Sequence, residues 1–121
     1  MKLNVNFTDI EADFLIQILN KFMSDNNMTD FPLKNKLLLN ENQFYTEEIE
    51  FLYLYLKCFK QTIEKYLYNP KINDENLLLN YKGVNHCLRK CRKSLEENNL
   101  DVSELCLSYN EFFKNNFSEF I

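Results

Sequence analysis

The longest stretch with a regular pattern of apolar and polar positions lies between Glu47 and Tyr68. Its apolar residues recur at alternating steps of three and four, which places them in one stripe of a helix. Neighbouring apolar residues widen this stripe to about half of the circumference, at roughly 100° per residue. We therefore predict a central helix that packs against neighbours on more than one side and keeps a polar arc in water. The apolar stripe comprises Ile49, Phe51, Leu52, Tyr55, Leu56, Cys58, Phe59, Ile63 and Tyr66, and the polar arc comprises Glu50, Lys57, Lys60, Gln61 and Glu64.

The residues before this helix predict a strand-like segment and two further helices. Lys2 to Phe7 alternates apolar and polar residues, but so short a strand cannot make a sheet alone. Thr8 and Glu11 have the spacing of a capping box, in which each side chain binds the other residue's backbone amide, so a helix is expected over roughly Asp9 to Ser24. Its apolar face comprises Ile10, Phe14, Leu15, Ile18, Leu19 and Phe22. A short helix is expected to begin at Pro32, because proline is tolerated in the first helical turn.

Two helices are expected after the central one. Asn73 or Asp74 can cap a third long helix that reaches about Asn98, with an apolar seam typical of helices packed nearly antiparallel. The seam comprises Leu77, Tyr81, Val84, Leu88, Cys91 and Leu95. Gly83 lies within this helix at a cost of roughly 1 kcal/mol against alanine, which indicates a close contact or a kink. A second capping-box spacing at Asp101 opens a last helix.

These elements predict an all-α fold class. The expected architecture is a single helical domain over residues 1–121, a bundle of four main helices plus a short one, organised by the long aromatic central helix. One glycine and two prolines are too few for the turns of an all-β domain. No run of about 18 apolar residues occurs, and acids among the first twenty residues do not fit a signal peptide. We therefore expect a cytoplasmic protein with no membrane segment and no cofactor.

The charge of the chain is segregated. Residues 82–93, KGVNHCLRKCRK, hold five basic residues and no acid, whereas nine basic and eighteen acidic residues remain elsewhere in a chain of net charge −4. On a helix these basic side chains fall on an exposed strip, away from the seam at Leu88. Arg89 and Arg92 are the chain's only arginines, and arginine offers a bidentate geometry to phosphate or carboxylate. The candidate partner-binding residues are Lys82, His86, Arg89, Lys90, Arg92 and Lys93.

Two interpretations of this strip remain open. It is either a contact surface for an acidic partner or for nucleic-acid phosphates, or a solvated face that acids of neighbouring helices balance. The balancing acids would be Glu96, Glu97 or the cluster from Glu47 to Glu50. The sequence pI of 5.0 disfavours non-specific nucleic-acid binding.

The candidate chemistry is sparse. Cys58, Cys87, Cys91 and Cys106 lie in segments expected to be helical, so we expect free thiols that pack as small apolar residues. A zinc site is the alternative, but three residues separate Cys87 from Cys91 where the familiar knuckle has two, and a helix turns His86 roughly 100° away from Cys87. His86 is the only histidine and has no acid near it in sequence. We expect no metal, no catalytic residue and no enzyme.

Aromatic residues offer a second candidate contact surface. Tyr53, Leu54 and Tyr68 fall on the wet side of the central helix, and Phe44 with Tyr45 precedes it. Exposed tyrosine and phenylalanine mark many interfaces. Either the short segment from residue 31 to residue 39 covers these side chains, or they form a contact face that a homodimer would use.

The function is inferred at the level of a class, because no motif identifies a family. Abundant Asn and Lys with only two Arg indicate an AT-rich genome. Small acidic helical proteins of such bacteria and their mobile elements act by binding another protein, as immunity and inhibitor proteins do, which is an analogy only. We expect a non-enzymatic protein-binding module, a small acidic inhibitor, immunity-type or adaptor protein whose partner is another protein. The alternative is a nucleic-acid-associated regulator that uses the basic helix face around residues 82–93.

Overall fold

The computed structural model describes residues 2–67 and 75–100, apart from the side chains of residues 75–77. The described elements are β1 (Lys2–Asn4), α1 (Asp9–Asp25), α2 (Pro32–Leu38), β2 (Gln43–Tyr45), α3 (Thr46–Leu67) and α4 (Glu75–Glu97). The chain is mostly helical with one two-stranded sheet, so the all-α prediction is confirmed. The expected caps at Asn73 or Asp74, the end of the central helix at Tyr68 and the last helix from Asp101 lie outside the described residues.

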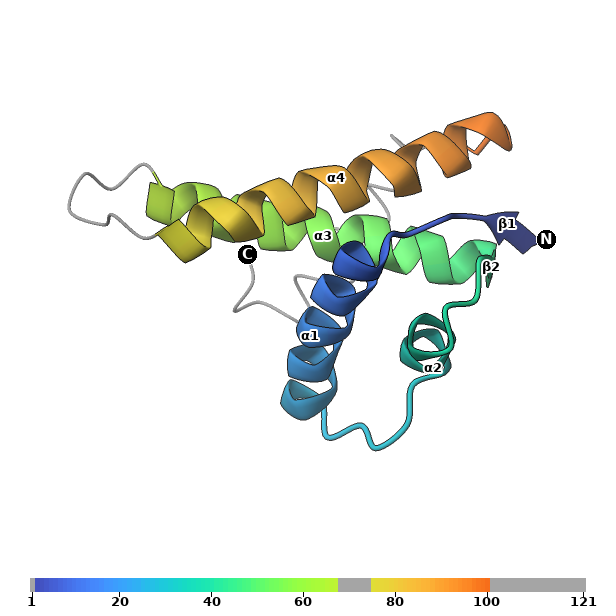
Figure 1. The fold of residues 1–121 in the computed structure, drawn as a ribbon, viewed down its shortest axis with the longest axis horizontal. Coiled ribbons are helices and arrows are strands. Elements are labelled where there is room, and N and C mark those ends of the chain that lie inside the picture. The colour runs from blue at the N-terminus through green and yellow to red at the C-terminus, as the bar shows by residue number, and fades with distance from the viewer. Residues whose placement is uncertain (1, 68–74, 101–121) are drawn as a thin grey trace.

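The two long helices α3 and α4 lie side by side and antiparallel along the molecule (Figure 1). The buried face of α4 comprises Val84, Cys87, Cys91 and Leu95, all with no measurable exposure. The predicted seam is therefore fully buried at Val84, Cys91 and Leu95, and partly buried at Tyr81 and Leu88, which pack against the core. Because Cys87 takes the central position, Leu88 is turned toward the edge that faces α3.

Helix α1 crosses this pair and packs on α3 through large rings (Figure 1). The Phe22 ring centroid lies 5.0 Å from that of Phe51 and 5.4 Å from that of Tyr55, both in edge-to-face geometry. Gly83 of α4 meets the Phe14 ring, which a Cβ at this glycine would approach to 3.4 Å. The close contact expected at the glycine is confirmed.

The predicted burial is wrong for two residues of the apolar faces, Ile10 and Tyr66. Ile10 is 83% exposed, because the buried residues of α1 centre on the opposite side of the helix. The face that is buried comprises Ala12, Leu15, Ile18, Leu19, Phe22 and Met23, about 150° from Ile10 at roughly 100° per residue. Tyr66 is half-exposed in the last described turn of α3. The capping box of Thr8 and Glu11 is confirmed in both directions.

The predicted N-terminal strand forms a sheet with a partner that the sequence did not reveal. β1 pairs antiparallel with β2, and Leu3 lies opposite Phe44 in the register. Both of these side chains are buried, so the sheet closes one end of the core. The sequence left open whether Phe44 is covered or exposed, and strand pairing turns its side chain inward.

The predicted aromatic contact face is largely absent. Tyr53 and Leu54 are buried in the structure, whereas Tyr45 is 50% exposed. Tyr68 lies outside the described residues. Most of the residues that would form this face are therefore buried and cannot contact a second copy of the chain, so the sequence-based support for a homodimer is largely removed.

Three helices end in the same turn, each with an asparagine. Asn27, Asn40 and Asn99 have φ values of 54°, 55° and 60°, in the left-handed region that glycine adopts most readily. After α1, the Met28 amide donates to the Met23 carbonyl at 2.8 Å, which is the long bond of a Schellman motif. The equivalent bonds close α2 and α4. Asparagine thus supplies the helix-ending turn in a chain with a single glycine.

Candidate functional site

The basic side chains of α4 point in three directions. Lys90 points toward α1, where its Nζ donates to Glu11 Oε1 at 2.5 Å and to the Asn6 carbonyl at 2.7 Å. This bond joins α4 to the first turn of α1, because Glu11 also accepts from the Thr8 amide. Burial raises the pKa of the Glu11 carboxyl, but hydrogen bonds from Lys90 and Thr8 outweigh burial, so the pKa is lowered overall.

The outer face of α4 carries exposed charges that acids on the same helix partly balance. Lys82 and His86 are exposed there. Lys93 Nζ lies 3.9 Å from Glu97 Oε1, one turn away, and such an exposed pair contributes only about 0.3–0.5 kcal/mol. The expectation that Glu97 balances this face is confirmed.

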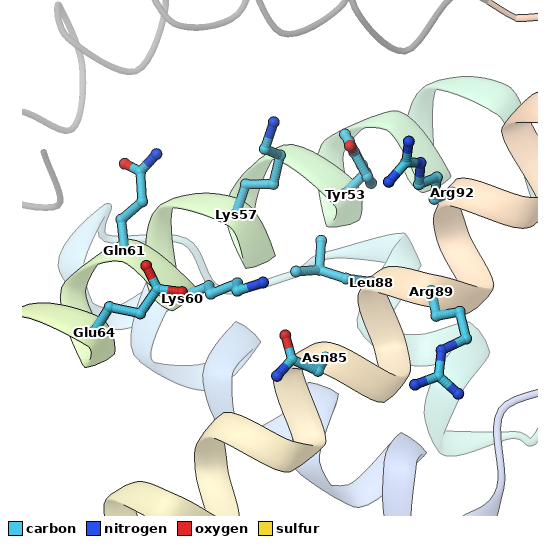
Figure 2. A pocket seen from close by; sticks show the side chains of 9 residues that line it. All are labelled: Tyr53, Lys57, Lys60, Gln61, Glu64, Asn85, Leu88, Arg89 and Arg92. Atoms are coloured by element: carbon cyan, nitrogen blue, oxygen red, sulfur yellow. The ribbon is translucent and has the colours of Figure 1, made fainter. Parts of the chain in front are cut away.

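The edge of α4 that faces α3 is different, because it forms one wall of an open pocket of about 680 Å³ (Figure 2). We name this pocket the α3/α4 groove. Its lining comprises Tyr53, Lys57, Lys60, Gln61 and Glu64 of α3, and Asn85, Leu88, Arg89 and Arg92 of α4. In the part of the chain that the structure describes, four cations and one carboxylate therefore line a single groove. Leu88, which packs at the edge of the core, lies between the two helices in Figure 2.

Aromatic rings hold the two lysines of the groove. Lys57 Nζ lies 5.5 Å from the Tyr53 ring centroid, and Lys60 Nζ lies 5.8 Å from that of Tyr81. Cation–π contacts of this kind contribute about 0.5–1 kcal/mol at exposed sites. The Tyr81 hydroxyl donates to Glu64 Oε1 at 3.0 Å, which fixes the one carboxylate of the lining.

The two arginines differ in their surroundings. Arg92 Nε donates to Glu96 Oε1 at 2.9 Å, and both side chains are more than half exposed, so the expected balance by Glu96 is confirmed. Arg89 is exposed and forms no hydrogen bond, ion pair or ring contact within residues 2–67 and 75–100. With no carboxylate partner among the described residues, this guanidinium offers a planar set of donors that suits a ligand.

The thiols do not form a reactive or metal-binding site among the described residues. Cys58, Cys87 and Cys91 are free and buried, which confirms the expectation for these three; Cys106 lies outside the described residues. Burial raises the pKa of the Cys87 thiol to about 12, and the Glu11 charge adds to the effect. Burial likewise raises the pKa of Cys91. Within the part of the chain that the structure describes, no group of three His, Cys, Asp or Glu side chains could hold a metal ion.

Sequence reasoning found half of the basic lining. Arg89 and Arg92 were singled out, but Lys57 and Lys60 were assigned only to the polar arc of the central helix. Their shared position on that arc was the available signal. The missing information was that α4 lies beside this arc, which turns separate lysines and arginines into one groove.

The chain thus belongs to the class of mostly helical proteins, with an open basic groove along a pair of antiparallel helices. Comparison with protein-family models, curated proteins and solved structures finds no match to this chain. None of the described helices is both long enough and apolar enough to cross a membrane. A function must therefore be argued from the groove itself.

Proposed function

We propose that this chain is a non-enzymatic protein-binding module, an inhibitor, immunity-type or adaptor protein, that meets its partner at the α3/α4 groove. The observation that carries the proposal is the convergence of Lys57, Lys60, Arg89 and Arg92 on one open groove. The chain as a whole carries a charge of −4, so this groove is a local positive region on an acidic protein. Localised complementary charge speeds association and fixes the orientation of a partner.

The lining supports binding more than chemistry. Among the described residues that line the groove, Glu64 is the only acid, and there is no histidine, cysteine, serine or aspartate. General acid–base catalysis needs a positioned donor and acceptor of protons near the operating pH, and two lysines with two arginines do not make such a pair. The groove instead offers cationic donors on rigid helices, which suits recognition of carboxylates. We expect this contact to be made inside the cell.

A nucleic-acid-associated regulator is the competing function. Three of the five cations in residues 82–93 already face acids of the chain, at Glu11, Glu96 and Glu97. This internal pairing weakens the positive field of the basic face of α4 alone, which the nucleic-acid function uses, whereas the groove adds Lys57 and Lys60 of α3. The protein-binding function is therefore favoured over the nucleic-acid one.

The test is an affinity capture with the full chain as bait, from a nuclease-treated lysate of a bacterium with an AT-rich genome. The bait is compared with Arg89→Ala/Arg92→Ala and with the control Lys82→Ala/Lys93→Ala. The two double variants are matched. Each removes two positive charges from α4, and each removes one ion pair between residues four positions apart on that helix, with Glu96 in the first case and Glu97 in the second.

We expect one protein to be retained by the wild type and by the control, and lost from the groove variant. Circular dichroism checks that both variants remain helical. Retention of nuclease-sensitive material alone would overturn the proposal in favour of the nucleic-acid function. Retention that survives in the groove variant would remove the groove from the contact.

A further inference from the structure

The two walls of the α3/α4 groove are in a fixed register. The hydrogen bond between Tyr81 and Glu64 places these two residues side by side. Because α3 and α4 run antiparallel, Lys60 then lies level with Asn85, and Tyr53 lies level with Arg92 (Figure 2). Glu64 therefore marks one end of the groove and Arg92 the other.

The length of the groove follows from this register. Residues 53 and 64 of α3 are about 16 Å apart along the helix at 1.5 Å per residue. An extended peptide advances about 3.3 Å per residue. The groove thus accommodates roughly five residues of extended chain.

Charge changes along this length. Arg89 and Arg92 lie toward one end, Lys57 and Lys60 lie in the middle, and Glu64 lies at the far end (Figure 2). A uniform polyanion would meet repulsion from Glu64, whereas a ligand with acids followed by a donor would meet attraction at both ends. The groove is therefore directional.

The aromatic residues favour a peptide over nucleic acid. Single-stranded nucleic acid binds by stacking its bases on exposed aromatic rings. Tyr53 is only 6% exposed, and the Lys57 ammonium lies over its ring. The Lys60 ammonium lies near the Tyr81 ring in the same way. These rings are engaged within the protein, so bases gain little from the groove.

We infer that the α3/α4 groove binds an extended acidic peptide segment of roughly five residues, with its carboxylates on Arg89, Arg92, Lys57 and Lys60 and a hydrogen-bond donor or a basic side chain at Glu64. The inference rests on the proposed protein-binding function and adds to it the chemistry of the partner segment. A short acidic segment places its negative charge only where the groove is positive. A longer polyanion would extend beyond the groove over a protein of net charge −4, which would repel it.

Fluorescence anisotropy tests this inference with labelled synthetic probes. The main probe, the glutamate peptide, has about four glutamates followed by one lysine, which matches the groove length. The comparison probes are the same peptide with glutamine in place of glutamate, and a single-stranded thymidine oligonucleotide. Titrations with the full chain are made at about 50 mM and 150 mM salt, because charge-driven binding weakens as ionic strength rises.

We expect the glutamate peptide to bind and the glutamine peptide not to bind. Arg89→Ala/Arg92→Ala should weaken glutamate-peptide binding at least about tenfold, the equivalent of about 1.4 kcal/mol, whereas Lys82→Ala/Lys93→Ala should change it by about twofold or less. Equal losses in the two double variants would overturn the inference, because the peptide would then sense net charge alone. Tighter binding of the oligonucleotide than of the peptide would overturn it as well.

Glu64→Gln gives a second test that does not depend on losing affinity. The added probe is a peptide of the same length in which glutamate replaces the final lysine. Removing the Glu64 carboxylate should raise the affinity for this all-glutamate peptide and should not raise the affinity for the peptide that ends in lysine. Equal effects on both peptides would overturn the directional placement of the segment.

Failure of this inference is distinguishable from failure of the proposed function. A captured partner that an excess of glutamate peptide does not displace would overturn the acidic-segment inference and leave protein binding in place. A partner displaced by the glutamate peptide but not by its glutamine counterpart would support both.

Discussion

Replacing Gly83 by alanine tests how closely α1 and α4 approach each other. A new Cβ would lie 3.4 Å from two atoms of the Phe14 ring and 3.5 Å from a third. Carbon atoms at optimal separation lie about 3.5–4.0 Å apart, so the ring needs to move by only a few tenths of an ångström. The substitution therefore creates a contact without a severe clash.

The magnitude follows from two gains and one cost. Alanine is more favourable than glycine in a helix interior by about 0.8–1.0 kcal/mol. A buried methyl group adds up to about 0.8 kcal/mol, but Gly83 is only partly buried, so less than this is expected. Tight packing against Phe14 opposes both gains. We expect Gly83→Ala to raise the free energy of unfolding by about 0.5–1 kcal/mol.

Urea unfolding followed by far-ultraviolet circular dichroism measures this change, with the midpoint rising at an unchanged slope. Gly83→Val is the matched control. Its two further methyl groups would crowd the Phe14 ring, so the free energy of unfolding should fall by about 1–3 kcal/mol. Destabilisation by alanine would refute the separation described for these helices. Equal tolerance of alanine and valine would refute the packing of Phe14 over this glycine.

Two further predictions concern helix ends. The folded-state pKa of Glu11 is lowered from its ordinary value of 4.5, so its contribution to stability is present above that value and is lost as pH falls through the folded-state pKa. Glu11→Gln should therefore lower the unfolding free energy by about 1 kcal/mol at pH 7 and should flatten its decline on acidification; an unchanged pH profile would contradict this. Asn27→Ala should cost about 1–2 kcal/mol because Asn27 has positive φ, whereas Asn27→Gly should be neutral or stabilising in the same denaturant assay.

The period of the apolar residues located the helices along the chain but did not show which side of each helix is buried. The period placed the end of α1 one residue short of its observed end, and the spacing of Thr8 and Glu11 identified the N-terminal capping box, because both signals depend on neighbours in sequence. The period misplaced Ile10 and Tyr66, since an apolar residue at the margin of a stripe is buried only if a neighbouring element covers that side. Which side is covered depends on tertiary packing, which local spacing does not encode.

The second strand and the groove were missed for a related reason. Gln43–Tyr45 is three residues long and becomes a strand only because β1 pairs with it. Lys57 and Lys60 become half of a basic site only because α4 places Arg89 and Arg92 opposite them. Both features join residues that are distant in sequence, so neither leaves a periodic signal of its own.

The bond from Lys90 to the start of α1 has a consequence for biosynthesis. The lysine is 84 positions from Asn6 and 79 from Glu11. At about 5–20 residues per second, a ribosome needs roughly 4–16 s to travel from the first turn of α1 to this lysine. During that time β1 and α1 have no α4 to pack against, so the part of their apolar surface that α4 covers stays open to solvent and to chaperones. The N-terminal elements of this chain are made first but can be completed only when α4 has emerged.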